Sequence, residues 1–306
     1  MRIAVVGAGA MGSLFGGLLS QVTEVTLVDS WREHVEAINR YGLRLAEPEG
    51  ELILHPTATT DPAAVRDADL AIVFVKSHQT AMAAGMAAQL LAPDGLALTM
   101  QNGVGNREVL AQVLGPQRVL QGVTSQGATL LGPGQVRHGG HGATHLETRP
   151  AIAAQAERIA SLFTQAGFET HLADDLASLI WGKLVINAGI NALTAILRVP
   201  NGLLAEVPPA RELVAAIVEE AVQVAAARSI RLPYDDPVAQ VLAVARATGS
   251  NRSSMLQDVM RGSRTEIEVI NGAIVREAEA AGLPAPYNRA LLALVRSLEA
   301  TYADRL

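Results

Sequence analysis

The sequence predicts an α/β protein with two domains, a doubly wound parallel sheet followed by an all-helical domain. Three observations predict it. Apolar runs that suit buried strands alternate with helical segments through the first half of the chain. The first apolar run, residues 3–6, ends at a glycine-rich turn. Beyond residue 174 nearly every segment has a helical pattern. We expect the first domain to cover residues 1–173 and the second residues 174–306.

The composition excludes several classes of protein. At 306 residues, 49% of them hydrophobic, the chain is long enough for two cores. Aromatic residues make up only 3% and the net charge is −6, so nucleic acid is not the expected partner. The absence of cysteine excludes disulfides and thiolate chemistry and favours a cytoplasmic protein. Without a membrane-length apolar run or a signal peptide, we expect no membrane partner.

The glycine-rich turn fits the G-x-G-x-x-G fingerprint of Rossmann-type domains. Gly7 suits the tight turn, Gly9 allows a pyrophosphate to approach the backbone, and Gly12 allows close packing of helix and strand. The pyrophosphate would lie at the N-terminus of the helix that follows, beside Ala10 and Met11. A glycine-rich turn without a ligand is the alternative, but a strand before it and a helix after it favour the dinucleotide site.

The second strand, residues 25–28, ends at Asp29, seventeen residues after Gly12. An acid near this offset accepts hydrogen bonds from the adenosine ribose of a dinucleotide. Its charge suits the free 2′-hydroxyl of NADH and repels the 2′-phosphate of NADPH. Arg32, three residues further on, could still reach that phosphate. The local residues therefore lean towards NADH, and Arg32 leaves NADPH open as well.

Further elements of the first domain follow the same alternation. Two polar residues, Lys76 and Asn102, each follow a strand and so fall at the sheet edge where ligands bind, although ordinary solvated turn residues would occupy the same positions. Besides residues 3–6 and 25–28, we expect strands at 70–75, 96–100, 119–129 and 168–172, a hairpin-like region at 43–54, and helices at 13–19, 31–39, 80–91, 106–114 and 151–166.

A long apolar helix over residues 175–197 carries one polar stripe. Lys183, Asn187 and Asn191 are spaced by four and share a helix face. Burying such groups is costly unless they are hydrogen-bonded or serve a ligand. Burial would also lower the pKa of a lysine towards the range that a proton donor needs. The structural alternative is that the stripe bonds to neighbouring backbone or that the lysine reaches solvent.

Two polar clusters further along the chain have spacings that are explained by helix capping, without any role in binding a ligand. Ser254 and Gln257 have the spacing of a capping box at a helix start. Glu266 would lie in the first turn of an amphipathic helix, where an acid complements the helix dipole. A third cluster, His138, His141 and His145, lies in a glycine-rich region with no acid at ligand spacing, so we expect no metal site there.

Taken together, these motifs resemble those of the ketopantoate reductase family, in order along essentially the whole chain. The resemblance implies a helical domain like the C-terminal domain of 6-phosphogluconate dehydrogenase. It also implies reduction of 2-dehydropantoate to (R)-pantoate with NADPH, in the pantothenate branch leading to coenzyme A. The matching residues are Gly7 to Gly12, Lys76, Asn102 and Gly103, Lys183, Asn187 and Asn191, Asn201 and Gly202, Ser253 to Asp258, and Thr265 to Glu268.

The same resemblance implies roles for individual residues. Lys183 would be the general acid that protonates the ketone oxygen, and Glu266 would help to position the substrate and Lys183. Lys76 and Asn102 would border the nicotinamide ribose and the substrate. Substrate contacts would come from Asn187, Asn191, Asn201 and Ser254.

Two other functions stay open at this point. A reductase of another 2-keto acid could use the same lysine and asparagines, because the sequence does not reveal the shape of the pocket. A non-catalytic nicotinamide-binding redox sensor could share the fold, although it would need no proton donor. In each case we expect a small molecule as the main partner, and the apolar helical domain is compatible with a homodimer.

Overall fold

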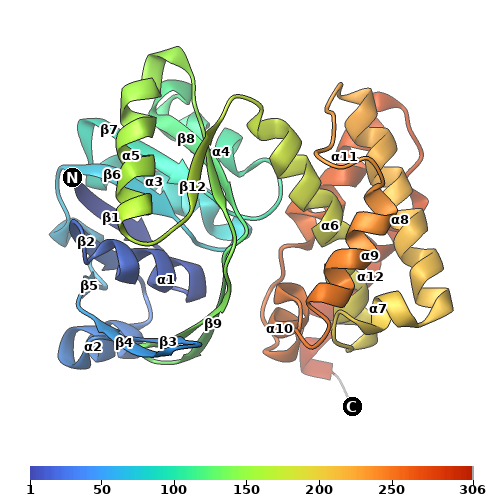
Figure 1. Ribbon diagram of the computed structural model, residues 1–306, viewed down its shortest axis with the longest axis horizontal. Coiled ribbons are helices and arrows are strands. Elements are labelled where there is room, and N and C mark those ends of the chain that lie inside the picture. The colour runs from blue at the N-terminus through green and yellow to red at the C-terminus, as the bar shows by residue number, and fades with distance from the viewer. Residues whose placement is uncertain (305–306) are drawn as a thin grey trace. The chain divides into compact units, whose positions relative to one another are not determined.

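The computed structural model describes residues 1–304, and contacts within the chain divide it into two compact units (Figure 1). Unit 1 comprises Met1–Gln101 and Asn106–Leu176. Unit 2 comprises Asn102–Gly105 and the described residues from Ala177 onward. A short loop that follows a strand of the first unit therefore belongs to the second. The expected domain boundary at residue 173 stays a prediction.

Unit 1 is built on an eight-stranded sheet in the order β12-β11-β8-β7-β6-β1-β2-β5. Neighbouring strands are parallel except for the antiparallel pair of β8 and β11. The strands are β1 (Arg2–Val6), β2 (Glu24–Val28), β5 (Thr57–Thr59), β6 (Ala68–Val73), β7 (Leu91–Thr99), β8 (Val119–Thr124), β11 (Thr144–Glu147) and β12 (Thr170–Ala173).

Both faces of this sheet are covered. Successive side chains of β1 point to opposite faces, so Ile3 and Val5 enter one apolar core while Ala4 and Val6 enter another. This arrangement confirms the predicted doubly wound sheet. The helices of unit 1 are α1 (Ala10–Leu19), α2 (Arg32–Tyr41), α3 (Thr80–Leu90), α4 (Asn106–Leu114) and α5 (Ala153–Gln165).

A second, four-stranded sheet has the order β4-β3-β10-β9 and packs on α1. Its strands are β3 (Leu43–Glu47), β4 (Gly50–Leu54), β9 (Gly127–Gly132) and β10 (Gln135–Gly140). The prediction of one strand over 119–129 was wrong, because β8 and β9 belong to different sheets. The chain turns between them, where the Thr124 hydroxyl accepts a hydrogen bond from the backbone N–H of Gln126.

Unit 2 is helical, as predicted (Figure 1). Its core is one apolar cluster. Its longest helix, α6, meets the length and hydropathy criteria for a membrane span, but 67% of the qualifying window is buried inside the fold, as in the core helix of a globular domain. The helices are α6 (Leu176–Leu197), α7 (Leu203–Glu206), α8 (Pro208–Ala227), α9 (Pro237–Ala247), α10 (Ser254–Met260), α11 (Asn271–Ala281) and α12 (Pro286–Ala300).

Short 3-10 helices complete the described secondary structure. They are η1 (Pro62–Ala64), η2 (Ser77–Gln79), η3 (Pro116–Arg118), η4 (Pro150–Ile152), η5 (Ile267–Val269) and η6 (Tyr302–Asp304).

Candidate active site

The glycine-rich turn between β1 and α1 has the geometry of a phosphate-binding loop. A Cβ atom on Gly12 would lie 1.8 Å from the carbonyl oxygen of Gly7, and one on Gly7, whose φ is +93°, would lie 2.9 Å from the backbone nitrogen of Val75. Packing therefore requires both glycines. A Cβ on Gly9 would meet no atom within 4 Å. Because Gly9 is exposed and precedes α1, open space lies where the fingerprint puts the pyrophosphate, so the loop fits a dinucleotide.

Asp29 supports this loop from the end of β2. Its carboxylate accepts hydrogen bonds from the backbone N–H of Ala8 at 2.7 Å and of Trp31 at 2.9 Å. One oxygen thus holds the glycine loop and the other holds the residue before α2. Arg32, the first residue of α2, is exposed.

His34 is a further support of the loop that the sequence analysis missed. Its Nδ1 accepts from the backbone N–H of Gly134, so its Nε2 donates to the Ser13 hydroxyl, which in turn donates to the Ala8 carbonyl. Burial lowers the pKa of His34, against the opposing charge of Asp29. A neutral histidine therefore links α2, α1 and the turn before β10.

Lys76 follows the segment that packs against Gly7. Its side chain is half-buried, and Lys76 occupies the position directly before η2. The side-chain amide of Gln101 donates to the Val75 carbonyl at 2.7 Å and to the Thr80 hydroxyl at 3.0 Å. Gln101 therefore ties the chain after β7 to the chain after β6 and holds the segment that carries Lys76.

The polar stripe predicted for α6 is present in unit 2. Asn191 is buried, whereas Lys183 and Asn187 are half-buried, and their spacing places them on one face of the helix. Burial lowers the pKa of Lys183 to about 8, and the negative charge of Glu266 opposes this shift. An ammonium group with this pKa is largely protonated near neutral pH and yet can give up its proton.

Glu266 does not lie in the first turn of a regular helix, as the spacing had suggested. It precedes the short η5, whereas α11 begins only at Asn271. Its side chain is buried, and its Oε2 accepts a hydrogen bond of 3.2 Å from the side-chain amide of Asn102. Tertiary structure therefore brings the charge of Glu266 close enough to act on Lys183, and it joins Glu266 to Asn102 by a hydrogen bond.

The loop that carries Asn102 is fixed to unit 2 by its backbone. The N–H of Val104 donates to the carbonyl of Val269 at 3.1 Å, and a Cβ on Gly103 would lie 2.2 Å from that same carbonyl oxygen. Only glycine fits this close approach, and the φ of +82° at residue 103 is also a conformation that favours glycine. Asn102 was predicted to lie at the ligand edge of the sheet, and its side chain bonds to Glu266.

Ser253, rather than Ser254, caps helix α10. The Ser253 hydroxyl accepts from the backbone N–H of Leu256 at 3.0 Å and from the Thr194 hydroxyl at 2.7 Å. The capping-box interpretation of Ser254 was therefore wrong by one residue. Ser254 is the first residue of the helix, and its side chain is exposed.

Asn201 is buried in a loop of unit 2. Its backbone N–H donates to the Asn251 carbonyl and its side-chain amide donates to the Thr248 hydroxyl at 2.9 Å. These bonds join the loop before α7 to the loop after α9. The described contacts of Asn201 are thus those of a residue that holds two loops together.

Each of the two units offers groups for a different part of a carbonyl reduction. The loop of unit 1 suits a dinucleotide phosphate, and unit 2 offers a partly desolvated ammonium group with a carboxylate and several amides. Such a set can polarise and protonate a carbonyl oxygen while another group supplies hydride to the carbonyl carbon.

Comparison with known proteins gives matches along nearly the whole chain. Residues 3–151 match the family model described as "Ketopantoate reductase PanE/ApbA", and residues 175–299 match the model of the C-terminal part of the same family. The 2-dehydropantoate 2-reductase of Halobacterium salinarum is 40% identical over 300 residues, which cover 97% of this chain and 98% of the relative. That of Archaeoglobus fulgidus is 39% identical over 301 residues, with 97% and 98% covered.

Solved structures are similar over the same length. A ketopantoate reductase of this family from Ralstonia eutropha superposes with a TM-score of 0.91 at 37% identity, covering 98% of this chain and 99% of its own. A D-mandelate dehydrogenase bound to NADH and anilino(oxo)acetate gives a TM-score of 0.90 at 33% identity, with the same coverage.

Proposed function

The chain belongs to the ketopantoate reductase family, and from this premise we propose that it is a 2-dehydropantoate 2-reductase, an oxidoreductase that makes pantoate with a nicotinamide cofactor. The observation that carries the proposal is the ammonium group of Lys183. Burial lowers its pKa to about 8, and the negative charge of the buried Glu266 acts on it. A non-catalytic redox sensor would need neither group.

The proton balance of the reaction follows from this site. When bound, the reduced nicotinamide supplies the hydride that reaches the ketone carbon. Lys183 donates a hydrogen bond to the ketone oxygen, polarises the carbonyl, and gives its proton to that oxygen as the new C–H bond forms. The product is then a neutral hydroxyl, and Lys183 takes up a proton from solvent before the next turnover.

Glu266 acts in this proposal as a positioning residue. Its negative charge favours the protonated form of Lys183, and its hydrogen bond from Asn102 fixes the carboxylate. Asn187, Asn191 and Ser254 provide amide and hydroxyl groups for the substrate's own hydroxyl and carboxylate. Asn201 contributes by holding the two loops that it bridges, and Lys76 borders the cofactor beside the glycine loop.

A direct assay tests the proposed function. Purified protein is mixed with 2-dehydropantoate and NADPH, and the loss of absorbance of the reduced cofactor is followed. We expect kcat/KM in the range of ordinary enzymes, about 10⁴ M⁻¹ s⁻¹ or higher. The absence of turnover with any 2-keto acid, while cofactor binding is retained, would favour the redox sensor instead.

A second candidate function has its own support. The D-mandelate dehydrogenase structures, one of them with NADH and anilino(oxo)acetate, cover 98% of this chain. A reductase of aryl 2-keto acids would use the same proton donor. Comparing kcat/KM for 2-dehydropantoate and benzoylformate separates the two functions, and a higher value for benzoylformate would replace the proposed substrate.

The proton donor makes the reduction rate dependent on pH. Since the protonated form of Lys183 is the active one, kcat/KM for the keto acid should be level below a pH of about 8 and fall above it. Glu266 raises the pKa of Lys183 by its charge. The Glu266→Gln variant should therefore lose activity at a lower pH than the wild type.

A neighbouring acid provides the control for this pH profile. Glu268 pairs with Arg296 at the surface, at 2.7 Å. Glu268→Gln should leave the profile of kcat/KM against pH where it is. If Glu266→Gln also leaves it unmoved, Glu266 has no electrostatic effect on the proton donor.

The choice of cofactor forms a further part of the proposal. We propose that NADPH is preferred and that NADH is accepted. Both carboxylate oxygens of Asp29 receive backbone N–H groups, which partly balance its charge, and exposed Arg32 is available to a 2′-phosphate at the start of α2. Arg32→Ala should then lower kcat/KM for NADPH about 10- to 100-fold and leave that for NADH almost unchanged.

Asp29 gives the matched comparison for cofactor choice. Asp29→Ala removes the bond that holds the glycine loop, so kcat/KM should fall with both cofactors, and further with NADH, which also loses a ribose acceptor. An unchanged ratio of the two kcat/KM values in both variants would show that neither residue distinguishes the cofactors. A homodimer and a cytoplasmic location stay predictions.

A further inference from the structure

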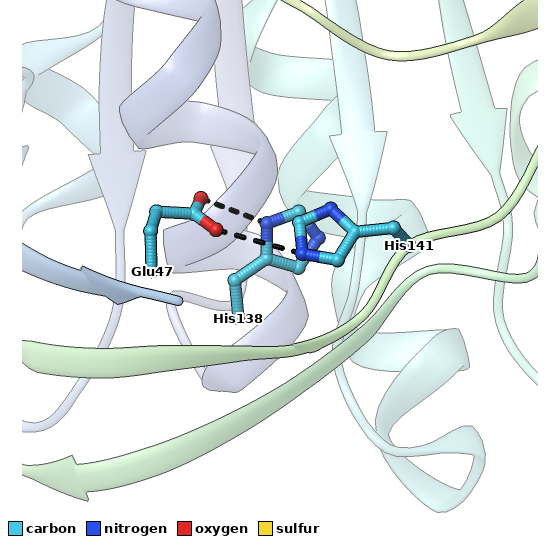
Figure 2. Close-up of side chains that lie close together, drawn as sticks. All are labelled: Glu47, His138 and His141. Atoms are coloured by element: carbon cyan, nitrogen blue, oxygen red, sulfur yellow. Dashed lines mark hydrogen bonds and ion pairs between the residues drawn. The ribbon is translucent and has the colours of Figure 1, made fainter. Parts of the chain in front are cut away.

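Two of the histidines in the glycine-rich region of unit 1 meet a carboxylate from a distant part of the chain (Figure 2). Glu47 ends β3, His138 lies in β10, and His141 follows β10 directly. One possible ligand atom from each residue lies within 4.8 Å of the others. The third histidine of the predicted cluster, His145, lies in β11 instead, with its ring 5.4 Å from that of His171.

The sheet explains how these three side chains meet. Strands β3 and β10 are parallel, with Arg137 paired to Ala46, so His138 lies alongside Glu47. In a regular strand, residues 138 and 141 would point to opposite faces. The pairing of β10 with β9 shifts by one residue between His138 and Gly140, as in a β-bulge. The extra residue brings His138 and His141 to the same side.

The distances suit a divalent transition metal. The Nδ1 of His138 is 2.8 Å from one carboxylate oxygen of Glu47, and the Nε2 of His141 is 3.6 Å from the other. Ligand atoms about 2.1 Å from a zinc ion are about 3–3.5 Å apart, depending on the geometry of coordination. The two contacts end on different oxygens of Glu47, and one ligand atom from each residue lies within 4.8 Å of the others. Side-chain adjustments would therefore place two imidazole nitrogens and one carboxylate oxygen around one ion.

A second layer of hydrogen bonds orients the His138 ring. The side-chain amide nitrogen of Gln126 donates to the Gly142 carbonyl at 2.6 Å, so its oxygen faces Nε2 of His138 at 2.7 Å. Nε2 must then carry a proton and donate it. Nδ1 faces the Glu47 carboxylate at 2.8 Å, and a metal ion bound there would replace the proton that Nδ1 shares with that carboxylate. Histidines that bind metals through one nitrogen commonly have the other one fixed by such a bond.

We propose that Glu47, His138 and His141 form a site for a divalent transition metal ion of the zinc, cobalt or nickel class. Two imidazoles and one carboxylate favour these ions over magnesium and calcium, which prefer oxygen ligands. The side chains of Glu47 and His138 are only 15% and 5% exposed, whereas that of His141 is 57% exposed. Glu47 and His138 therefore form the buried part of the site, and the site opens to solvent beside His141.

A bound ion would have a structural effect in this position. It would connect the end of β3 with the chain that follows β10, and the small sheet that contains both strands packs on α1. Metal binding should therefore stabilise unit 1. The site is independent of the proposed reduction, for which Lys183 supplies the proton, so each proposal can fail without the other.

Zinc titration of the untagged, metal-free protein tests the site. Isothermal titration calorimetry should show one zinc ion bound per chain by the wild type. Glu47→Gln and His141→Ala should weaken this binding more than 100-fold, and Gln126→Ala should weaken it about 10- to 100-fold, as expected for a residue that orients a ligand. His55→Ala, at another exposed histidine, is the control and should bind as the wild type does.

Two further measurements distinguish this site from other zinc binding. Cobalt bound to the wild type should give visible d–d absorption bands that are lost in His141→Ala, which should itself fold normally because its side chain is exposed. Zinc should raise the Tm of the wild type and not that of Glu47→Gln. The proposal is overturned if all variants bind zinc equally, or if the wild type binds none at micromolar concentrations.

Discussion

Replacing Lys183 with alanine is expected to lower kcat for keto-acid reduction by about 10²–10⁴-fold, the usual contribution of a positioned general acid. The affinity for the reduced cofactor should stay near the wild-type value, because the glycine loop belongs to unit 1 and Lys183 to unit 2. Steady-state kinetics give kcat, and titration of the nucleotide fluorescence gives the cofactor Kd. A small primary amine such as methylamine should partly restore the rate in Lys183→Ala.

The control for this experiment is an exposed cation of the same unit, Arg211. Arg211→Ala should keep the wild-type kcat, which separates proton donation from a general change of charge. A kcat for Lys183→Ala within a few-fold of the wild type would exclude Lys183 as the proton donor. Loss of cofactor binding in the same variant would instead indicate damage that extends beyond the reacting group.

Replacing Glu220 with alanine is expected to lower the free energy of unfolding of unit 2 by about 3–5 kcal/mol. Glu220 is buried in α8, and its carboxylate accepts hydrogen bonds from the backbone N–H groups of Tyr287 and Asn288 and from the side-chain amide of Asn288. These donors belong to the first turn of α12, which has no side-chain cap of its own. The variant leaves them without their acceptor, and the two bonds from Asn288 are buried.

The exposed neighbour Glu219 provides the matched control. Glu219→Ala should change the free energy of unfolding by no more than about 0.5 kcal/mol. Urea unfolding can be followed by the fluorescence of Trp181, which is buried in α6, in a Trp31→Phe background so that the signal reports unit 2. Equal effects of the two glutamate substitutions would show that the cap of α12 contributes little.

Local patterns predicted most of the architecture. The apolar run before Gly7, the glycine fingerprint and the alternation of strands and helices are properties of short segments, and they predicted the doubly wound sheet. The spacing of Lys183, Asn187 and Asn191 likewise predicted one polar face of α6. Periodicity suffices in these cases, because a buried strand or helix must show the same pattern wherever it packs.

The wrong predictions share a physical cause. The single strand over 119–129 became β8 and β9 because a hydroxyl–backbone bond turns the chain between two sheets. Ser254 was expected to be the cap of α10, but the hydroxyl of Ser253 reaches both Leu256 and Thr194. The local sequence is compatible with either outcome in both cases. The pairing of β8 with β11 and of β9 with β10, and the contact of Ser253 with Thr194, select between the outcomes.

The sequence by itself therefore determined the fold class, the glycine-rich turn between the first strand and helix, and the helical character of the second half, and it singled out Lys183 as the proposed proton donor. Only the tertiary structure decided that Asn102 meets Glu266, that Glu220 caps α12, and that Glu47 joins His138 and His141. Local patterns record which face of a segment is buried. They do not record which distant side chain completes a hydrogen bond or a ligand set, because strand pairing and helix packing fix those distances.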